Sequence, residues 1–166
     1  MSGFTLKKIE TSGIAHALEK AERYRLLNDP AQAESICRDV LEVEPAHQDA
    51  LRHLILALTD QFHLPSGGSG TSRETRNYIA QLTDEYERAY YTGIAFERET
   101  RAYLERKNVI RSAAYDGFRH AMEWYERAEQ LRPHDTDAVL RWNSCVRAIE
   151  REKLEPEAAS HELPLE

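Results

Sequence analysis

The chain has 166 residues and a formal net charge of −7, from 22 Lys and Arg against 29 Asp and Glu. This length suits a single domain with its own core. The acidic balance argues against a nucleic-acid partner, because phosphate contacts need clustered Lys and Arg. The longest apolar run, Leu54 to Leu58, is far shorter than the roughly 20 residues of a membrane-spanning helix. Residues 1–13 lack the apolar core of a signal peptide, so we expect a cytoplasmic protein that does not enter a membrane.

Apolar residues recur at helical spacing along almost the whole chain, and no alternating strand pattern appears. The sequence therefore predicts an all-α protein. Ser12 is expected to cap a first helix that runs to about Leu27. Asp29 is a good N-cap for the second helix, and Pro30 suits its first position, where a missing N–H costs nothing. That helix should end before Pro45.

A third helix is expected after the turn at Pro45, and it should stop at the glycine-rich loop of residues 65–70. Thr71, followed three residues later by Glu, has a capping-box pattern and predicts the start of a fourth helix. Asp84 repeats this pattern and predicts a fifth helix. No Gly or Pro stands just before Asp84, so one helix that continues through Asp84 remains an alternative.

The last third of the chain predicts two more helices. Residues 107–116 are expected to form an irregular joint or a long helix end, and residues 118–131 form a helix that stops before Pro133. Asp135 should cap the final helix. This gives about seven helices in one domain, residues 12–152, after a flexible N-terminus of residues 1–11. Residues 153–166 are acidic, contain two prolines, and are expected to be disordered.

Residues 29–50 and 116–138 are close to copies of one another. Their shared positions, in order, are Ala33, Cys37, Val40 and Pro45 in the first copy, and Ala121, Tyr125, Ala128 and Pro133 in the second. With these residues the chain resembles the tetratricopeptide repeat family, whose unit of about 34 residues has small residues where paired helices cross and a proline at the exit. Ala21 with Tyr24, and Gly93 with Phe96, match the small-then-aromatic pair of first helices. The segments YYTGIAFERE, AMEWYERAEQLRP and LRWN also resemble small bacterial repeat proteins, which implies no activity.

The spacing of the copies adds detail to this resemblance. Pro45 and Pro133 are farther apart than two repeats of about 34 residues would place them. The extra residues fall in the glycine-rich loop and around residues 104–117. The resemblance thus implies three degenerate repeats and a closing helix, arranged as an α-solenoid of antiparallel helix hairpins.

Such a solenoid presents the first helix of each hairpin on a concave face, and this implies a non-catalytic adaptor or scaffold that binds a protein or peptide. Arginines on that face could hold a peptide carboxylate by bidentate pairing. The alternative is that these charges only form a solvated helix surface. The candidate peptide-binding residues are Arg25, Asp49, Arg52, Leu56, Tyr90, Ile94, Glu97, Arg98, Ser144 and Arg147.

Glu97 stands out among these candidates because apolar residues flank it. Its carboxylate could anchor a basic or amide group of a ligand. Its spacing to Arg101 equally predicts a structural ion pair within one helix. Both interpretations are open at this point.

No cofactor, metal or catalytic site is expected. His120 and Glu123 stand in the reverse order of a di-iron Glu-x-x-His motif, and no second helix matches them. Cys37 and Cys145 lie in helical patterns and are expected to be buried free thiols. A small acidic secretion chaperone is the main alternative function, and a metal-binding or catalytic helical bundle is an alternative of another class. A homodimer through the apolar side of the last helix also remains open.

Overall fold

The computed structural model describes residues 3–65 and 69–158. Over these ranges the chain forms seven α-helices and one short 3₁₀ helix, without a strand, so the predicted all-α class is confirmed. The elements are η1 (Thr11–Gly13), α1 (Ile14–Leu26), α2 (Pro30–Val43), α3 (Gln48–Thr59), α4 (Ser69–Ile79), α5 (Glu85–Leu104), α6 (Arg111–Leu131) and α7 (Thr136–Arg151).

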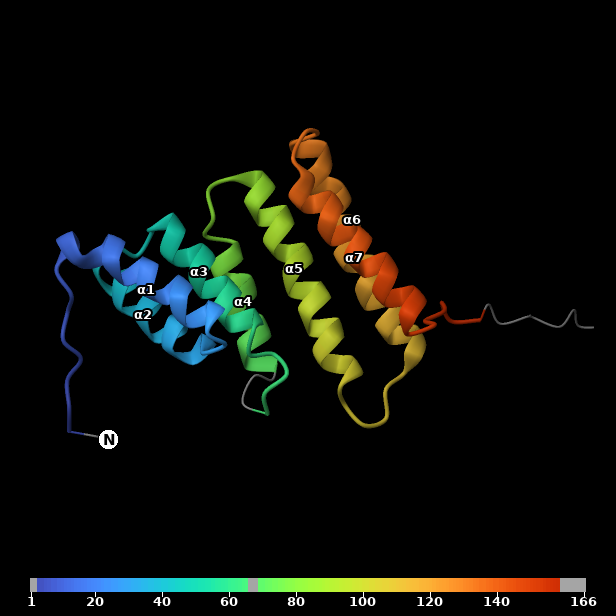
Figure 1. Ribbon diagram of the computed structural model, residues 1–166, viewed down its shortest axis with the longest axis horizontal. Helices are drawn as coiled ribbons and strands as arrows, with labels where there is room; N and C mark the ends of the chain where they lie inside the picture. Colours follow the sequence, from blue (N-terminus) through green and yellow to red (C-terminus); the bar gives the residue numbers. More distant parts are fainter. Residues whose placement is uncertain (1–2, 66–68, 159–166) are drawn as a thin grey trace, which may run out of the picture.

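Each helix packs against the next one along the chain, and the odd-numbered helices also contact each other, α1 with α3, α3 with α5, and α5 with α7. Figure 1 shows the helices side by side in a row, with α1 and α2 at one end and α6 and α7 at the other. Side chains from α1, α3, α5 and α7 can therefore meet on one surface, which we call the odd-helix face.

The junction of α1 and α2 forms as the sequence predicts. Asn28 adopts a left-handed conformation with φ of 60°. The N–H of Asp29 then donates to the carbonyl of Tyr24 at 2.8 Å, which closes α1 in the manner of a Schellman motif. The Asp29 carboxylate accepts from the N–H of Gln32 at 3.3 Å and caps α2, with Pro30 at its first position.

Three predicted helix starts are wrong. Ser12 does not cap α1, because residues 11–13 form a 3₁₀ turn and α1 begins at Ile14 after Gly13, which gives no side-chain cap. Helix α4 begins at Ser69, so Thr71 lies inside it rather than at its N-terminus. Helix α6 begins at Arg111, and the irregular joint is confined to residues 105–110. Of the predicted glycine-rich loop, residues 66–68 lie outside the described ranges.

The helix is interrupted between α4 and α5, so the continuous helix considered above does not form. Leu82 lies in the turn and is buried, only 1% exposed. The Asp84 carboxylate accepts from the N–H of Tyr86 at 2.8 Å and caps α5. The Arg88 guanidinium donates to the carbonyls of Leu82 and Thr83 at 2.6 and 3.0 Å. Burial of Leu82 and these hydrogen bonds stabilise the turn without Gly or Pro.

Small residues occupy the sites where helices pack most closely. The repeated positions Ala33, Val40, Ala121 and Ala128 are all fully buried. At Gly93 of α5, a Cβ atom would come within 2.5 Å of the Tyr125 ring on α6. Only glycine therefore allows α5 and α6 to approach at this point.

The end of α7 continues into an ordered turn. The N–H of Leu154 donates to the carbonyl of Ile149 at 2.9 Å, and Lys153 adopts a left-handed conformation with φ of 50°. The Leu154 side chain is 5% exposed and belongs to the core around α5, α6 and α7. The first residues of the predicted tail thus extend the core, and residues 159–166 lie outside the described ranges.

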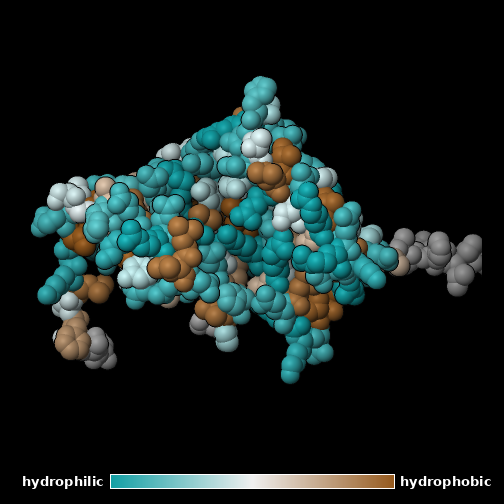
Figure 2. Space-filling view, in the orientation of Figure 1, coloured by the Kyte–Doolittle hydropathy of each residue, from teal (hydrophilic) through white to brown (hydrophobic). Residues whose placement is uncertain are grey.

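In the part of the chain that the structure describes, no helix combines the length and the apolar character needed to cross a bilayer. Figure 2 shows one face of the molecule, on which hydrophilic residues predominate and apolar residues form small separate groups. Broad apolar patches mark many association surfaces. The face seen in Figure 2 therefore presents mainly hydrophilic groups to a partner.

Candidate functional site

All ten predicted peptide-binding residues lie on odd-numbered helices. Helix α1 carries Arg25, and α3, α5 and α7 carry the others. The contacts among these helices bring charged members of the set together on the odd-helix face. The candidate site is built around four arginines and two carboxylates, which we call the arginine cluster: Arg25, Arg98, Arg101, Arg141, Asp60 and Glu97.

The first part of the arginine cluster joins α1, α3 and α5. Asp60 follows the last residue of α3 and accepts from Arg25 Nε at 2.7 Å. Its other carboxylate oxygen pairs with the Arg98 guanidinium, which also donates to Thr59 Oγ1 at 2.6 Å and to the carbonyl of Leu56 at 3.2 Å. The side chains of Arg25 and Arg98 are each 19% exposed. Two half-buried guanidinium groups thus share one carboxylate.

The second part joins α5, α6 and α7 around Glu97, whose side chain is 2% exposed. The Tyr125 hydroxyl donates to its carboxylate at 2.7 Å, and Arg101 Nε donates at 3.0 Å. A nitrogen of Arg141 lies 3.6 Å from the same carboxylate. Arg101 also donates to the Ser144 hydroxyl at 3.0 Å. The predicted ion pair with Arg101 is confirmed, and Glu97 has no free face with which to anchor a basic ligand group.

Positive charge exceeds negative charge within the arginine cluster, because four guanidinium groups face two carboxylates. Burial lowers the pKa of Arg98, and the nearby charges of Arg141 and Arg25 lower it further, against the effect of Asp60 and Glu97. For Arg141, burial is the largest effect and lowers the pKa, but Glu97, Tyr125 and Tyr90 together raise it, and the net shift is upward. A second anion next to Arg98 would stabilise its charged form.

Around Arg52 of α3 the balance of charge is the opposite, because two carboxylates face one guanidinium group. The Arg52 guanidinium pairs with Asp49 and, at 2.9 Å, with Glu87 of α5. Burial lowers the pKa of Arg52, but its hydrogen bond with Asp49 and the charge of Glu87 raise it overall. Arg52 therefore stays charged, and Asp49 and Glu87 balance its charge. The excess positive charge lies in the arginine cluster.

The remaining predicted residues differ in what they can offer a ligand. Ile94 is 1% exposed and forms part of the core, so it cannot line a binding surface. Leu56 and Tyr90 are partly buried against the same core. Arg147 is exposed on α7.

The prediction missed three charged residues of the odd-helix face, Asp60, Glu87 and Arg141. Asp60 directly follows α3, so no helical periodicity points to it. Glu87 and Arg141 reach partners 35 and 44 positions away, Arg52 and Glu97. The sequence carries no local signal for these pairs, since they depend on how α3, α5 and α7 pack.

Two polar side chains each have a buried atom without a hydrogen-bond partner among the described residues. The Nδ1 atom of His53 has no hydrogen-bond partner in the described part of the chain, and neither has the Tyr86 hydroxyl. Burial lowers the pKa of His53; the charge of Glu22 raises it by a smaller amount, and that of Arg25 lowers it further. His53 is therefore neutral at neutral pH.

Both cysteines are free and fully buried, as predicted. Burial raises the pKa of Cys37 and of Cys145 to about 12. Because the thiolate is the reactive form, neither thiol is activated as a nucleophile. Over the described ranges, no three His, Cys, Asp or Glu side chains lie close enough together to hold a metal ion.

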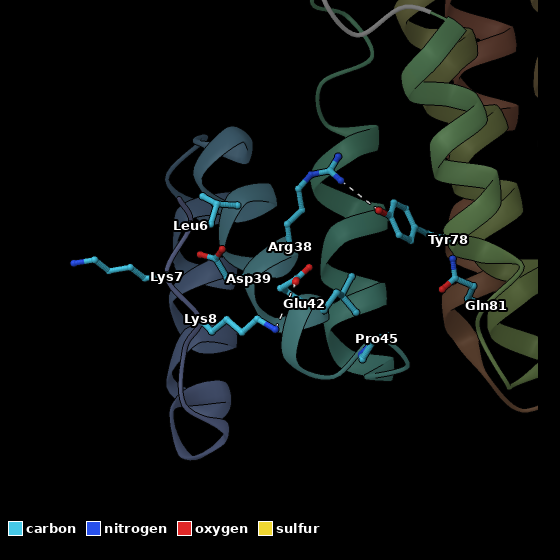
Figure 3. Close-up of a pocket in the computed structure, with 10 residues that line it drawn as sticks. Leu6, Lys7, Lys8, Arg38, Asp39, Glu42, Pro45, Tyr78 and Gln81 are labelled. Atoms are coloured by element: carbon cyan, nitrogen blue, oxygen red, sulfur yellow. Dashed lines mark hydrogen bonds and ion pairs between the residues drawn. The ribbon is translucent and has the colours of Figure 1, made fainter. Parts of the chain in front are cut away.

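Two grooves lie between successive even-numbered helices. Figure 3 shows the α2–α4 groove, of about 520 Å³, which Tyr78 of α4 and Arg38 of α2 line together with Leu6 of the N-terminal segment. Arg38 there is paired with Glu34 and Glu74, each at 2.8 Å. The α4–α6 groove, of about 620 Å³, lies over α5 and is lined in part by Phe96 and Trp124.

No known family, curated protein or solved structure matches this chain. The function must therefore be argued from the chain's own side chains and their arrangement.

Proposed function

We propose that this protein is a non-catalytic adaptor that binds an acidic peptide segment of a partner protein on its odd-helix face. The observation that carries this proposal is the arginine cluster, in which four arginines from α1, α5 and α7 face two carboxylates. The chain as a whole has a net charge of −7, so the sign of the charge in this cluster is opposite to that of the whole protein. A carboxylate of a ligand would balance it through charge-assisted hydrogen bonds.

We further propose that the helices form a solenoid of antiparallel hairpins like that of the tetratricopeptide repeat family. The contacts of α1 with α3, α3 with α5 and α5 with α7 support this arrangement. The burial of Ala33 and Ala121 at equivalent places in α2 and α6 supports it as well. In such an array the odd-helix face is the concave surface.

A peptide suits this surface better than a small anion does. The charged groups are spread over four helices, so a ligand must be extended to reach them all. Tyr90 and Tyr91 of α5 are both partly buried beside the charged groups and offer aromatic area for side chains of a peptide. The arginines are already paired, so they are held in place before a ligand arrives, and this lowers the entropic cost of binding.

The proposal is tested with a fluorescein-labelled peptide, acetyl-SDEYDELDS-amide, whose binding is followed by fluorescence anisotropy. The wild-type protein should bind it, and the affinity should fall as salt is added. Arg141→Met keeps most of the side-chain length and removes the charge, so it should weaken binding about tenfold. Arg73→Met is the matched control, because Arg73 is exposed on α4, away from the cluster.

Equal affinities of wild type, Arg141→Met and Arg73→Met would contradict the proposal. So would tighter binding of a peptide in which lysines replace the acidic residues. Circular dichroism of each variant shows that the helices are intact, and it separates a lost contact from a lost fold.

A further inference from the structure

The α4–α6 groove differs from the arginine cluster in place and in chemistry. It is formed by one side of α4, the outward side of α5 and one side of α6, and its volume of about 620 Å³ is within the range of roughly 300–1,000 Å³ for ligand sites. None of its lining residues belongs to the arginine cluster. Its lining includes Ile79, Arg88, Ala89, Thr92, Phe96 and Trp124.

The lining of this groove is apolar at the bottom. Ile79 and Ala89 are buried and lie at its base. Phe96 is partly buried, and Trp124, at 37% exposure, stands on the α6 side. A leucine or aromatic side chain of a ligand would lose its contact with water here, which favours binding.

Three arginines surround this apolar base, and one of them pairs with no carboxylate in the described part of the chain. Arg76 is paired with Glu99 at 2.9 Å, and Arg127 with Glu85 at 2.6 Å. Arg88 donates through one nitrogen to the backbone carbonyls of Leu82 and Thr83 and is in no ion pair with any described residue. Its guanidinium is fixed by these carbonyls, and its other N–H groups remain to bind an anion.

The α2–α4 groove offers a comparison with Arg88, because the arginine in that groove is paired with carboxylates. The arginine there, Arg38, is held between two carboxylates, Glu34 and Glu74, and also donates to the Tyr78 hydroxyl at 3.3 Å (Figure 3). The positive charge of Arg38 is therefore balanced by these carboxylates. The two grooves have similar volumes. They differ in their arginines, since Arg38 pairs with carboxylates, whereas Arg88 pairs with none in the described part of the chain.

We propose that the α4–α6 groove is a second docking site, which takes a short partner segment with an apolar side chain next to a glutamate or aspartate. The apolar side chain packs on Phe96 and Trp124, and the carboxylate pairs with Arg88. This site is independent of the odd-helix face, because it shares no residue with the arginine cluster. A protein with both sites can hold two partner segments at once, on opposite sides of α5.

The test uses Trp124 as a local reporter. The chain has only two tryptophans, so the Trp142→Phe variant of the full chain reports from Trp124 alone. The probe peptide acetyl-SELFELS-amide should change the Trp124 emission in a saturable manner. The neutral peptide acetyl-SQLFQLS-amide should bind roughly tenfold more weakly, since it cannot form the charge-assisted bond with Arg88.

Two variants locate the site. Arg88→Met should weaken the acidic peptide about tenfold and leave the neutral peptide unchanged, whereas the control Arg73→Met should alter neither. Arg88 also stabilises the turn before α5, so Thr92→Glu provides a second variant. It places a negative charge in the groove without removing that support, and it should likewise weaken the acidic peptide.

Three results would overturn the proposal. One is an unchanged Trp124 emission at saturating acidic peptide. Another is a dimer of the unliganded protein that Arg88→Met dissociates, since a second copy would then be the occupant. A third is tighter peptide binding by the full-chain variant Leu163→Ser with Leu165→Ser, because the acidic, leucine-containing end of the chain itself would then fill the groove. The Arg141→Met variant should bind the acidic peptide acetyl-SELFELS-amide with unchanged affinity. This result distinguishes the α4–α6 groove from the arginine cluster.

Discussion

The Tyr125 hydroxyl of α6 donates a 2.7 Å hydrogen bond to the Glu97 carboxylate of α5, and both side chains are almost fully buried. This bond fixes the carboxylate that orients Arg101 and Arg141. Burial, with the charge of Glu97, raises the pKa of Tyr125 well above its ordinary value. The hydroxyl therefore stays protonated and remains a donor at neutral pH.

Tyr125→Phe should destabilise the protein by about 1–3 kcal/mol, because a buried carboxylate loses one of its hydrogen-bond donors. Urea denaturation followed by circular dichroism measures this change. Tyr115→Phe, a change to a partly buried tyrosine at the other end of α6, is the control and should cost less. Equal losses in the two variants would show that the Glu97 contact adds nothing to stability.

Gly93→Ala should destabilise the protein, because the added methyl group would lie 2.5 Å from a Tyr125 ring atom and 3.0 Å from another. The ring cannot swing away without breaking its bond to Glu97. Overpacking of this kind costs about 1–3 kcal/mol, and thermal denaturation would measure it. Gly13→Ala is the control, since a Cβ there meets no atom within 4 Å. A Gly93→Ala protein as stable as the wild type would disprove the close contact of α5 with α6.

His53 should make stability depend on pH. Burial lowers its pKa below 6.5 in the folded state, with Arg25 and Arg52 also lowering it and Glu22 and Asp49 raising it. As pH falls below 6.5, the unfolded chain binds the proton first, so the free energy of unfolding decreases until the pH passes the folded pKa. His53→Gln should lose less stability than the wild type between neutral and mildly acidic pH. Parallel pH profiles for the two proteins would exclude this role of His53.

Cys37 and Cys145 should resist alkylation by iodoacetamide in the folded protein. Both are fully buried, and a pKa of about 12 leaves almost no thiolate at pH values where the protein is handled. In urea both should react, as mass spectrometry would show. Ser35→Cys places a thiol at an exposed position of α2 and should react at once. Rapid labelling of either native cysteine without urea would contradict their burial.

The sequence predicted well those features that depend on neighbouring residues. Asp29 and Asp84 cap helices as expected, because the N-cap bond spans only two or three residues. The Glu97–Arg101 pair was predictable for the same reason, since residues four apart lie on one face of a helix.

Features that depend on packing could not be read from the sequence. The Thr71 pattern looks like a capping box, yet α4 already begins at Ser69. Asp60 joins Arg25 to Arg98 only because α1, α3 and α5 lie side by side. The burial of Glu97 likewise requires α6 to cover α5, which its own neighbours in sequence do not reveal.

Binding of an acidic peptide by the arginine cluster is tested most directly by NMR of the arginine Nε–Hε groups during titration with acetyl-SDEYDELDS-amide. The signals of Arg25, Arg98, Arg101 and Arg141 should shift together and saturate at one peptide concentration, while that of Arg73 stays in place. Bound peptide that leaves these four signals unmoved would contradict the assignment of the odd-helix face as the binding surface.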